Sequence, residues 1–248
     1  MPNRFNHQSV PIENHILRSL PPSDFERISP HLQPVQLNHS EVLNEVDEVI
    51  QSVYFPNLAI VSLIAQDTTG QSVEVGVVGF EGIVGLSSAF GVDKSPYYVL
   101  VQLPNSGSRM SVRAFREEFK RAGALHDLAL RYAQSLLQHT AQLALCNRVH
   151  ALSERLARWL LMSYDRCQCL DLPFTHEFLS LMLGVRRAGV TEAAIILQAE
   201  GYIRYRRGEI TILDNEGLKE HTCECYPLLR KEFYSLVGES ATNVKSLA

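Results

Sequence analysis

The pattern of residues along the chain changes near Arg113, and this change limits the possible folds. From about Val35 up to Arg113 the chain consists of short β-branched and aromatic runs separated by Asn, Asp, Gly and Pro, which is typical of strands joined by turns. From Ala114 to about Arg148 there is no Pro and one Gly, and apolar residues recur at helical spacing. The 248 residues are enough for two cores, so the sequence predicts an α+β protein in which a β-roll precedes a long helix.

The predicted long helix, residues 124–150, carries two apolar stripes. One stripe, which we assign to the dimer helix, contains Leu125, Leu128, Tyr132, Leu136, His139 and Leu143. The other contains Leu130, Ala133, Leu137, Ala141 and Ala144. Two apolar stripes on one helix need two partners. We expect the β-roll to cover one stripe and the same helix of a second copy to cover the other; a single intramolecular core that covers both is the alternative.

The segment after Pro173 has the pattern of two short helices joined by a tight turn. Thr175 suits the N-cap of a helix over His176 to Leu183. Gly184 then supplies the left-handed backbone that such a turn requires. A second helix is predicted from Arg186 to Ala199, with its inward side formed by Val190, Ala193, Ile196 and Leu197.

Two β-like runs follow the second short helix. They cover Tyr202–Tyr205 and Glu209–Leu213 and flank Arg206, Arg207 and Gly208, so a hairpin with a basic tip is predicted. Residues 186–207 hold five Arg against two Glu, whereas residues 1–115 hold six Lys or Arg against eleven Asp or Glu. The formal net charge of -4 therefore hides a basic segment suited to nucleic acid.

The order of β-runs, long helix, helix-turn-helix and basic hairpin resembles the cyclic-AMP receptor protein and FNR (Crp-Fnr) superfamily of transcription regulators. The resemblance runs from about Leu17 to Asp214 and is carried by the strings SVYFPN, VEVGVVGFEGIVG and LPFTHEFLSLMLGVRRAGVT. It implies a cyclic-nucleotide-binding-like β-roll (jelly roll), a dimerisation helix and a C-terminal winged helix-turn-helix. The implied limits are 1–115 for the roll, 116–150 for the helix, 151–236 for the DNA-binding domain and 237–248 for a tail.

The resemblance also implies which residues contact DNA. The superfamily opens its recognition helix with an Arg-Glu pair and places a second Arg four residues after that Glu. Aligned on Gly184, the first Arg is Arg187, which fits bidentate bonding to guanine, whereas Ala188 and Glu192 replace the other two residues. Gly189 is expected to allow close approach to the duplex, and the hairpin arginines to meet phosphates. The full predicted set is Thr175, Arg186, Arg187, Gly189, Thr191, Glu192, Arg204, Arg206 and Arg207.

The stretch that matches the effector pocket of cyclic-AMP-binding members is poor in polar groups. It contains Gly82, Gly85, Leu86, Ser87 and Ser88, with Leu86 at the position of a ribose-binding Glu. The stretch up to Pro96 holds no Arg, and a buried cyclic phosphate without a cation would be costly, so cyclic-AMP binding is not expected. The chain has no Cys before Cys146, so it lacks the N-terminal thiolates of the iron–sulfur members. No cofactor is predicted, and the effector is left unassigned.

The five cysteines include two pairs that are separated by one residue, Cys167 with Cys169 and Cys223 with Cys225. Together they could form a four-thiolate zinc site, with His176 or His221 as alternative ligands. The usual spacing leaves two residues between paired cysteines. We therefore predict free thiols and no metal.

The predicted function is a sequence-specific DNA-binding transcription regulator that acts as a homodimer and is not an enzyme. Its expected partners are double-stranded DNA, a second copy and RNA polymerase, without a membrane. No apolar run approaches the roughly 20 residues of a membrane span and the start does not resemble a signal peptide, so the cytoplasm is expected. One alternative is an enzyme built on the β-roll, although His39 is the one histidine in residues 35–113. The other is an interaction adaptor whose wing does not bind DNA.

Overall fold

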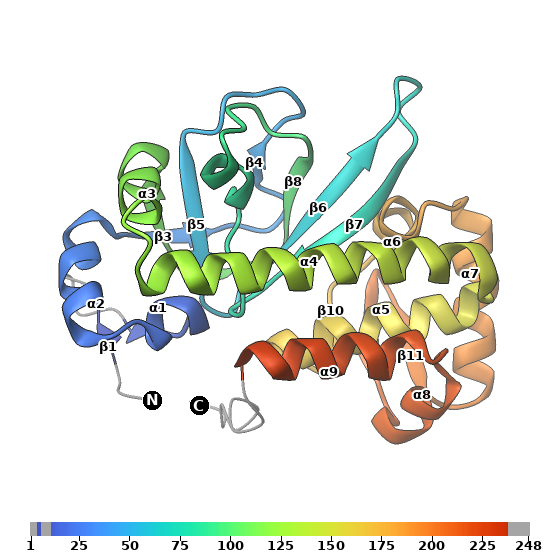
Figure 1. Cartoon of the computed structure of the whole chain (residues 1–248). Coiled ribbons are helices and arrows are strands. Elements are labelled where there is room, and N and C mark those ends of the chain that lie inside the picture. The colour runs from blue at the N-terminus through green and yellow to red at the C-terminus, as the bar shows by residue number, and fades with distance from the viewer. Residues whose placement is uncertain (1–3, 6–10, 238–248) are drawn as a thin grey trace. The chain divides into compact units, whose positions relative to one another are not determined.

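The computed structural model describes residues 4–5 and 11–237. They form two compact units, one with residues 4–5, 11–65 and 76–137 and the other with residues 66–75 and 138–237. The division falls inside the long helix α4, Ala124–Val149 (Figure 1). The predicted tail lies, apart from Val237, outside the described residues.

The first unit is an antiparallel β-roll preceded by short helices. One sheet has the strand order β3-β9-β5 and the other has the order β4-β8-β6-β7, while β1 pairs with β2. The bounds are β1 Arg4–Phe5, β2 Pro11–Ile12, α1 His15–Ser19, α2 Pro22–Ile28, η1 Ser29–His31, β3 Gln33–Leu37, β4 Val42–Asn44, β5 Ser52–Pro56, β6 Ile60–Gln66, β7 Ser72–Val78, η2 Leu86–Phe90, β8 Tyr98–Leu103, β9 Asn105–Ser111 and α3 Val112–Phe119. This arrangement confirms the predicted roll.

Alternation along the strands explains why they form a roll. In β5, Val53 and Phe55 are fully buried while Tyr54 between them is half-buried, and Val53 pairs with buried Met110 of β9. Successive side chains of a strand point to opposite faces, so alternate residues fill the interior. Phe115 of α3 packs edge-on against Phe55, with ring centroids 6.3 Å apart, and closes this end of the core.

The first half of α4 packs on the roll through side chains of its first stripe. A Cβ added to Gly82 would lie 2.3 Å from Cζ of Tyr132, and one added to Gly76 would lie 3.0 Å from Cδ1 of Leu136. The Tyr132 ring occupies the space that a Cβ on Gly82 would take, and the end of the Leu136 side chain lies close to Gly76. The roll therefore covers this part of the stripe.

The second unit contains the rest of α4, the tip of the β6–β7 hairpin and all later elements. The bounds are α5 Leu152–Cys167, β10 Asp171–Leu172, α6 His176–Leu183, α7 Arg187–Ala199, β11 Ile203–Arg206, β12 Glu209–Ile212, α8 Asn215–His221 and α9 Cys225–Val237. Strands β10, β12 and β11 form an antiparallel sheet in that order. Trp159 of α5 lies 4.8 Å from the Phe174 ring and donates from Nε1 to Oε1 of Glu74 at 2.9 Å. These contacts place α5 at the centre of the unit.

The two stripes of α4 differ in their exposure, and this corrects the assignment of the dimer helix. Leu125, Tyr132, His139 and Leu143 are buried within the chain, and Leu128 and Leu136 are half-buried. The second stripe is open: Leu130 is 42% exposed, Leu137 is 64% exposed, and Ala141 and Ala144 are exposed too. Periodicity alone does not distinguish the two stripes, because both have helical spacing. The second stripe is therefore the apolar face of α4 that the described residues leave exposed.

Among the described residues, no helix combines the length and the apolar character that a membrane span needs.

Candidate nucleic-acid interface

The helix-turn-helix is built from local signals that the sequence makes visible. Thr175 caps α6 by accepting a hydrogen bond at Oγ1 from the Phe178 backbone N–H at 3.1 Å. Gly184 ends α6 in the left-handed conformation with φ of 62°. Arg186 is the N-cap of α7, so the second helix begins at Arg187, one residue later than expected. The turn orients α7 across α6.

One face of α7 is buried, and the predicted inward set needs one correction. Val190, Ala193, Ala194 and Leu197 are buried, whereas Ile196 is 46% exposed. The buried residues follow the spacing i, i+3, i+4 and i+7 of one helix face. Ile196 lies off that face, and Ala194 belongs on it.

The opposite side of α7, near its first turn, is open and carries charge. Arg186, Arg187 and Glu192 are exposed. Neither arginine forms an ion pair with any residue in the described part of the chain. Two unpaired guanidinium groups at the start of this helix can donate hydrogen bonds to base edges or phosphates.

Gly189 and Thr191 have structural roles that the sequence did not indicate. A Cβ on Gly189 would lie 3.1 Å from Cδ2 of Leu152 in α5, so its small size also serves helix packing. The Thr191 hydroxyl donates to the Arg187 carbonyl at 3.1 Å and lies 3.0 Å from Nδ1 of His176. Thr191 therefore fixes the start of α7 from within the domain.

His176 is a positioning residue that sequence reasoning missed. Its ring contacts Thr191 of α7 and stacks on Tyr205 of β11, with ring centroids 3.9 Å apart. Burial, and then the nearby charge of Arg187, lowers the pKa of His176. A neutral imidazole thus connects α6, α7 and the hairpin. The signal was weak because a lone histidine after an N-cap suits many roles.

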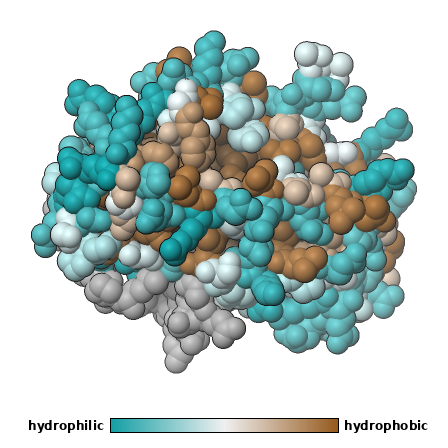
Figure 2. Space-filling view, in the orientation of Figure 1, coloured by the Kyte–Doolittle hydropathy of each residue, from teal (hydrophilic) through white to brown (hydrophobic). Residues whose placement is uncertain are grey.

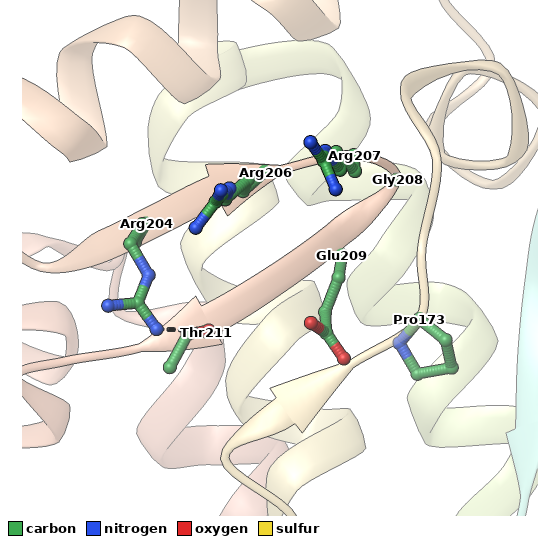
Figure 3. A pocket seen from close by; sticks show the side chains of 7 residues that line it. All are labelled: Pro173, Arg204, Arg206, Arg207, Gly208, Glu209 and Thr211. Atoms are coloured by element: carbon green, nitrogen blue, oxygen red, sulfur yellow. Dashed lines mark hydrogen bonds between the residues drawn. The ribbon is translucent and has the colours of Figure 1, made fainter.

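The β11–β12 hairpin is the predicted wing. Its turn residues Arg207 and Gly208 have φ of 53° and 86°, the conformation that favours tight hairpins. Figure 3 shows Arg204 and Arg206 on one strand and Arg207 at the turn, and Arg204 donates from Nη2 to Oγ1 of Thr211 at 3.3 Å. These arginines line an open groove together with Pro173, Gly208, Glu209 and Thr211.

The exposed charged residues of α7 and the wing form what we call the reading surface, which consists of Arg186, Arg187, Glu192, Arg204, Arg206 and Arg207. All six were among the predicted DNA-binding residues. Five positive charges against one negative charge make this surface basic in a chain of negative net charge. Such a surface attracts a polyanion over distances comparable with the Debye length.

The stretch matched to an effector pocket is largely filled by the chain itself. Gly85 has φ of 81° and is the N-cap of η2, in which Leu86 and Ser88 are buried and Ser87 is half-buried. Arg116 of α3 donates from Nε to the Ser88 carbonyl at 2.7 Å and from Nη2 to Oδ1 of Asp93 at 2.7 Å. The Tyr132 ring lies against Gly82. The guanidinium of Arg116 therefore reaches this loop from α3, but its hydrogen bonds are already made to the Ser88 carbonyl and to Asp93.

The two cysteine pairs do not gather into one site. Cys167 and Cys169 contact each other, with Sγ of Cys169 3.2 Å from the Cys167 carbonyl. Cys223 and Cys225 instead lie beside Cys146 and His150, and the ligand atoms of these four residues are within 4.8 Å of one another. The Cys146 to His150 spacing of one helical turn is the sequence signal that was missed.

Comparison with known proteins agrees with this geometry. Residues 154–221 match the family of Crp-like helix-turn-helix domains. No curated protein matches this sequence. Among solved structures, a putative Crp/Fnr-family transcriptional regulator from Eubacterium rectale has a TM-score of 0.66 and 16% identity, with 83% of this chain and 96% of that chain covered. The c-di-GMP-responsive global regulator CLP of Xanthomonas campestris has a TM-score of 0.65 and 16% identity, covering 77% and 98%. FixK2 of Bradyrhizobium japonicum has a TM-score of 0.64 and 15% identity, covering 77% and 98%.

The fold and the reading surface define the winged helix-turn-helix class of DNA-binding proteins. Residues 154–221 place the chain more narrowly, because they form a Crp-like helix-turn-helix domain, and the fold is that of Crp/Fnr regulators. The predicted resemblance to the Crp-Fnr superfamily is confirmed.

Proposed function

We propose that the chain binds specific DNA sites as a homodimer and regulates transcription there. The observation that carries this proposal is the reading surface, in which exposed arginines gather at the start of α7 and on the wing and form no ion pair with the residues that the structure describes. In helix-turn-helix proteins the start of the second helix enters the major groove. The wing then meets the sugar–phosphate backbone beside it.

The residues divide into those that select a sequence and those that supply affinity. Arg187 lies at the first turn of α7, where its fork can bind O6 and N7 of guanine. Glu192 can accept a hydrogen bond from cytosine N4. Arg204, Arg206 and Arg207 fit phosphates, which fix register without reading sequence.

The second stripe of α4 is the proposed contact between two copies. Leu130, Leu137 and Ala144 are spaced seven residues apart and are exposed, which is the spacing of a helix pair. Figure 2 shows apolar side chains gathered along the course that α4 takes in Figure 1. Burial of this stripe against its own copy would remove apolar surface from water and pair the two reading surfaces.

A titration with duplex DNA at two salt concentrations tests the DNA-binding half of the proposal. The apparent association constant is expected to fall steeply with salt, with a slope close to -0.9 for each phosphate contact, so about 10³-fold weaker binding between 50 and 200 mM salt for roughly six contacts. The Arg206→Ala, Arg207→Ala double variant should show a shallower slope. The matched control is Arg113→Ala, because Arg113 is an exposed arginine of α3 with a side chain that is 89% exposed. An equal loss of DNA affinity in the two variants would contradict a contact between the wing and DNA.

Sedimentation of Leu137→Glu tests the homodimer. The wild type is expected to sediment as a dimer and the variant as a folded monomer, because a buried unpaired carboxylate opposite its own copy is costly. Val49→Glu is the control, since Val49 is 49% exposed on the β-roll. A dimer that survives Leu137→Glu contradicts the proposed contact.

The remaining parts of the proposal concern partners and chemistry. We propose RNA polymerase as a further partner, an effector other than cyclic AMP, and no enzymatic activity. His39, the histidine that an active site on the roll would use, has Nδ1 2.8 Å from the Gln102 carbonyl. That contact gives the imidazole a structural role.

A further inference from the structure

Four side chains with metal-binding atoms meet where the end of α4 lies beside the start of α9. Cys146 and His150 are one helical turn apart on α4, while Cys223 and Cys225 lie at the loop before α9 and at its first residue. The three cysteines are buried, and the side chain of His150 is 13% exposed. The cluster joins segments that are more than 70 residues apart in the sequence.

The separations within the cluster match the edges of a tetrahedral metal site. The Sγ atoms of Cys146 and Cys223 are 3.6 Å apart, and Sγ of Cys225 is 3.5 Å from Nδ1 of His150. Thiolates about 2.3 Å from Zn²⁺ at tetrahedral angles lie about 3.8 Å from one another, and a thiolate lies slightly nearer to an imidazole nitrogen. All four ligand atoms are within 4.8 Å of one another, so the space suits one ion.

Hydrogen bonds from neighbouring side chains hold His150 and Cys225 in the orientation of metal ligands. Nε2 of His150 lies 3.1 Å from Oε1 of Glu224, so the outer nitrogen is held by a carboxylate and Nδ1 faces the thiols. Carboxylate–histidine contacts of this kind fix the ring and tautomer of zinc-binding histidines. Gln142 donates from Nε2 to Sγ of Cys225 at 3.0 Å. Two outer contacts thus converge on two of the four residues.

We propose that Cys146, His150, Cys223 and Cys225 bind one zinc ion in a tetrahedral site with three thiolates and one imidazole. Soft thiolates with an imidazole select Zn²⁺ over hard cations such as Mg²⁺ and Ca²⁺. Four protein ligands leave no open position, so the ion has a structural role. It fastens the first turn of α9 to the end of α4, just before α5 begins the DNA-binding domain. Binding releases the thiol protons to solvent.

Metal content and Co²⁺ spectroscopy of the reduced full-length chain test the proposal. After dialysis against metal-free buffer, the zinc-loaded wild type is expected to keep one zinc per chain. Co²⁺ in its place should give the intense visible bands of tetrahedral coordination and a thiolate charge-transfer band. Cys225→Ser should lose tight zinc binding, and His150→Cys should keep one ion with the spectrum of four thiolates. The matched control Cys167→Ser, Cys169→Ser should behave as the wild type, since those thiols lie outside the cluster.

Other results would overturn the proposal. The proposal is contradicted if the wild type retains no zinc or if its Co²⁺ complex gives the weak spectrum of octahedral coordination. It is also contradicted if Cys225→Ser retains as much zinc as the wild type. A disulfide between Cys146 and Cys223 whose reduction yields no metal binding would instead assign the cluster to thiol chemistry. If Cys225→Ser fails to fold, as circular dichroism would reveal, the Co²⁺ spectra of the wild type and His150→Cys still decide.

Discussion

The stretch Gly82–Ser88 of the β-roll and the reading surface both depend on glycines, but they use them in opposite ways. Gly82 leaves room for the ring of Tyr132, and Leu86 beyond it is buried. Gly208 turns the wing so that the arginines before it are exposed. The chain covers the first region with its own side chains and leaves the second open.

This difference separates two kinds of contribution. A side chain that the chain covers contributes to the free energy of unfolding, whereas an exposed arginine without an ion-pair partner contributes little. Substitutions in covered positions should therefore change stability, and substitutions on the reading surface should change DNA binding. A variant that changed both stability and DNA binding would contradict this distinction.

The largest expected effect is on the pH dependence of stability at a covered position of α4. Burial, and then the charges of Arg166 and Arg158, lowers the pKa of His139 to about 3. Below its unfolded pKa of about 6.5 the unfolded chain binds a proton that the folded chain does not bind, so this residue destabilises the fold as pH falls. Between pH 6.5 and 4 the wild type should lose up to about 3 kcal/mol more than His139→Leu. Urea unfolding at several pH values measures this, and parallel profiles of the two proteins would contradict a buried neutral His139.

Next in size is the loss of stability from Gly82→Ala. The added methyl group would overlap the Tyr132 ring, so we expect a loss of about 1–3 kcal/mol in the free energy of unfolding with no change in DNA sequence preference. Gly123→Ala is the control, because a Cβ there meets its nearest atom at 3.7 Å. Equal stability of the two variants would mean that this part of the roll is not closed by Tyr132.

Arg187→Ala should have the reverse profile. We expect it to lose about 1–3 kcal/mol of discrimination at one base pair of the binding site, while its unfolding free energy stays within about 0.5 kcal/mol of the wild type. Affinities for oligonucleotides that differ by one base pair measure this. An unchanged preference at every base pair would refute the role of Arg187 in reading sequence.

The smallest expected effect belongs to a single wing arginine. Arg206→Ala should weaken binding to all sequences alike and lower the salt slope by about 1, the effect of one phosphate contact. Binding isotherms at several salt concentrations on specific and unrelated duplexes give the slope. A loss confined to the specific duplex would show that Arg206 reads bases.

The sequence predicted the fold and all six residues of the reading surface because local signals carry them. Gly184 and Gly208 mark turns that need left-handed backbone, and helical spacing marks α6 and α7. These features depend on residues that are close in the sequence, so they can be predicted without the tertiary structure.

What the sequence could not supply was the partner of each side chain. Periodicity gave α4 two stripes but not which one the chain covers. The small size of Gly189 was expected to serve DNA, and its contact with Leu152 of α5 could be found only in the tertiary structure. Cys223 could not be matched with Cys146 because 77 residues separate them and only folding brings them together.

Selection of bound fragments from a random duplex pool tests most directly whether two copies of the reading surface meet DNA side by side. The wild-type protein is expected to enrich inverted repeats whose half-sites are centred about one helical turn, roughly 34 Å, apart. Enrichment of single, unrepeated sites, or no enrichment at all, would contradict it.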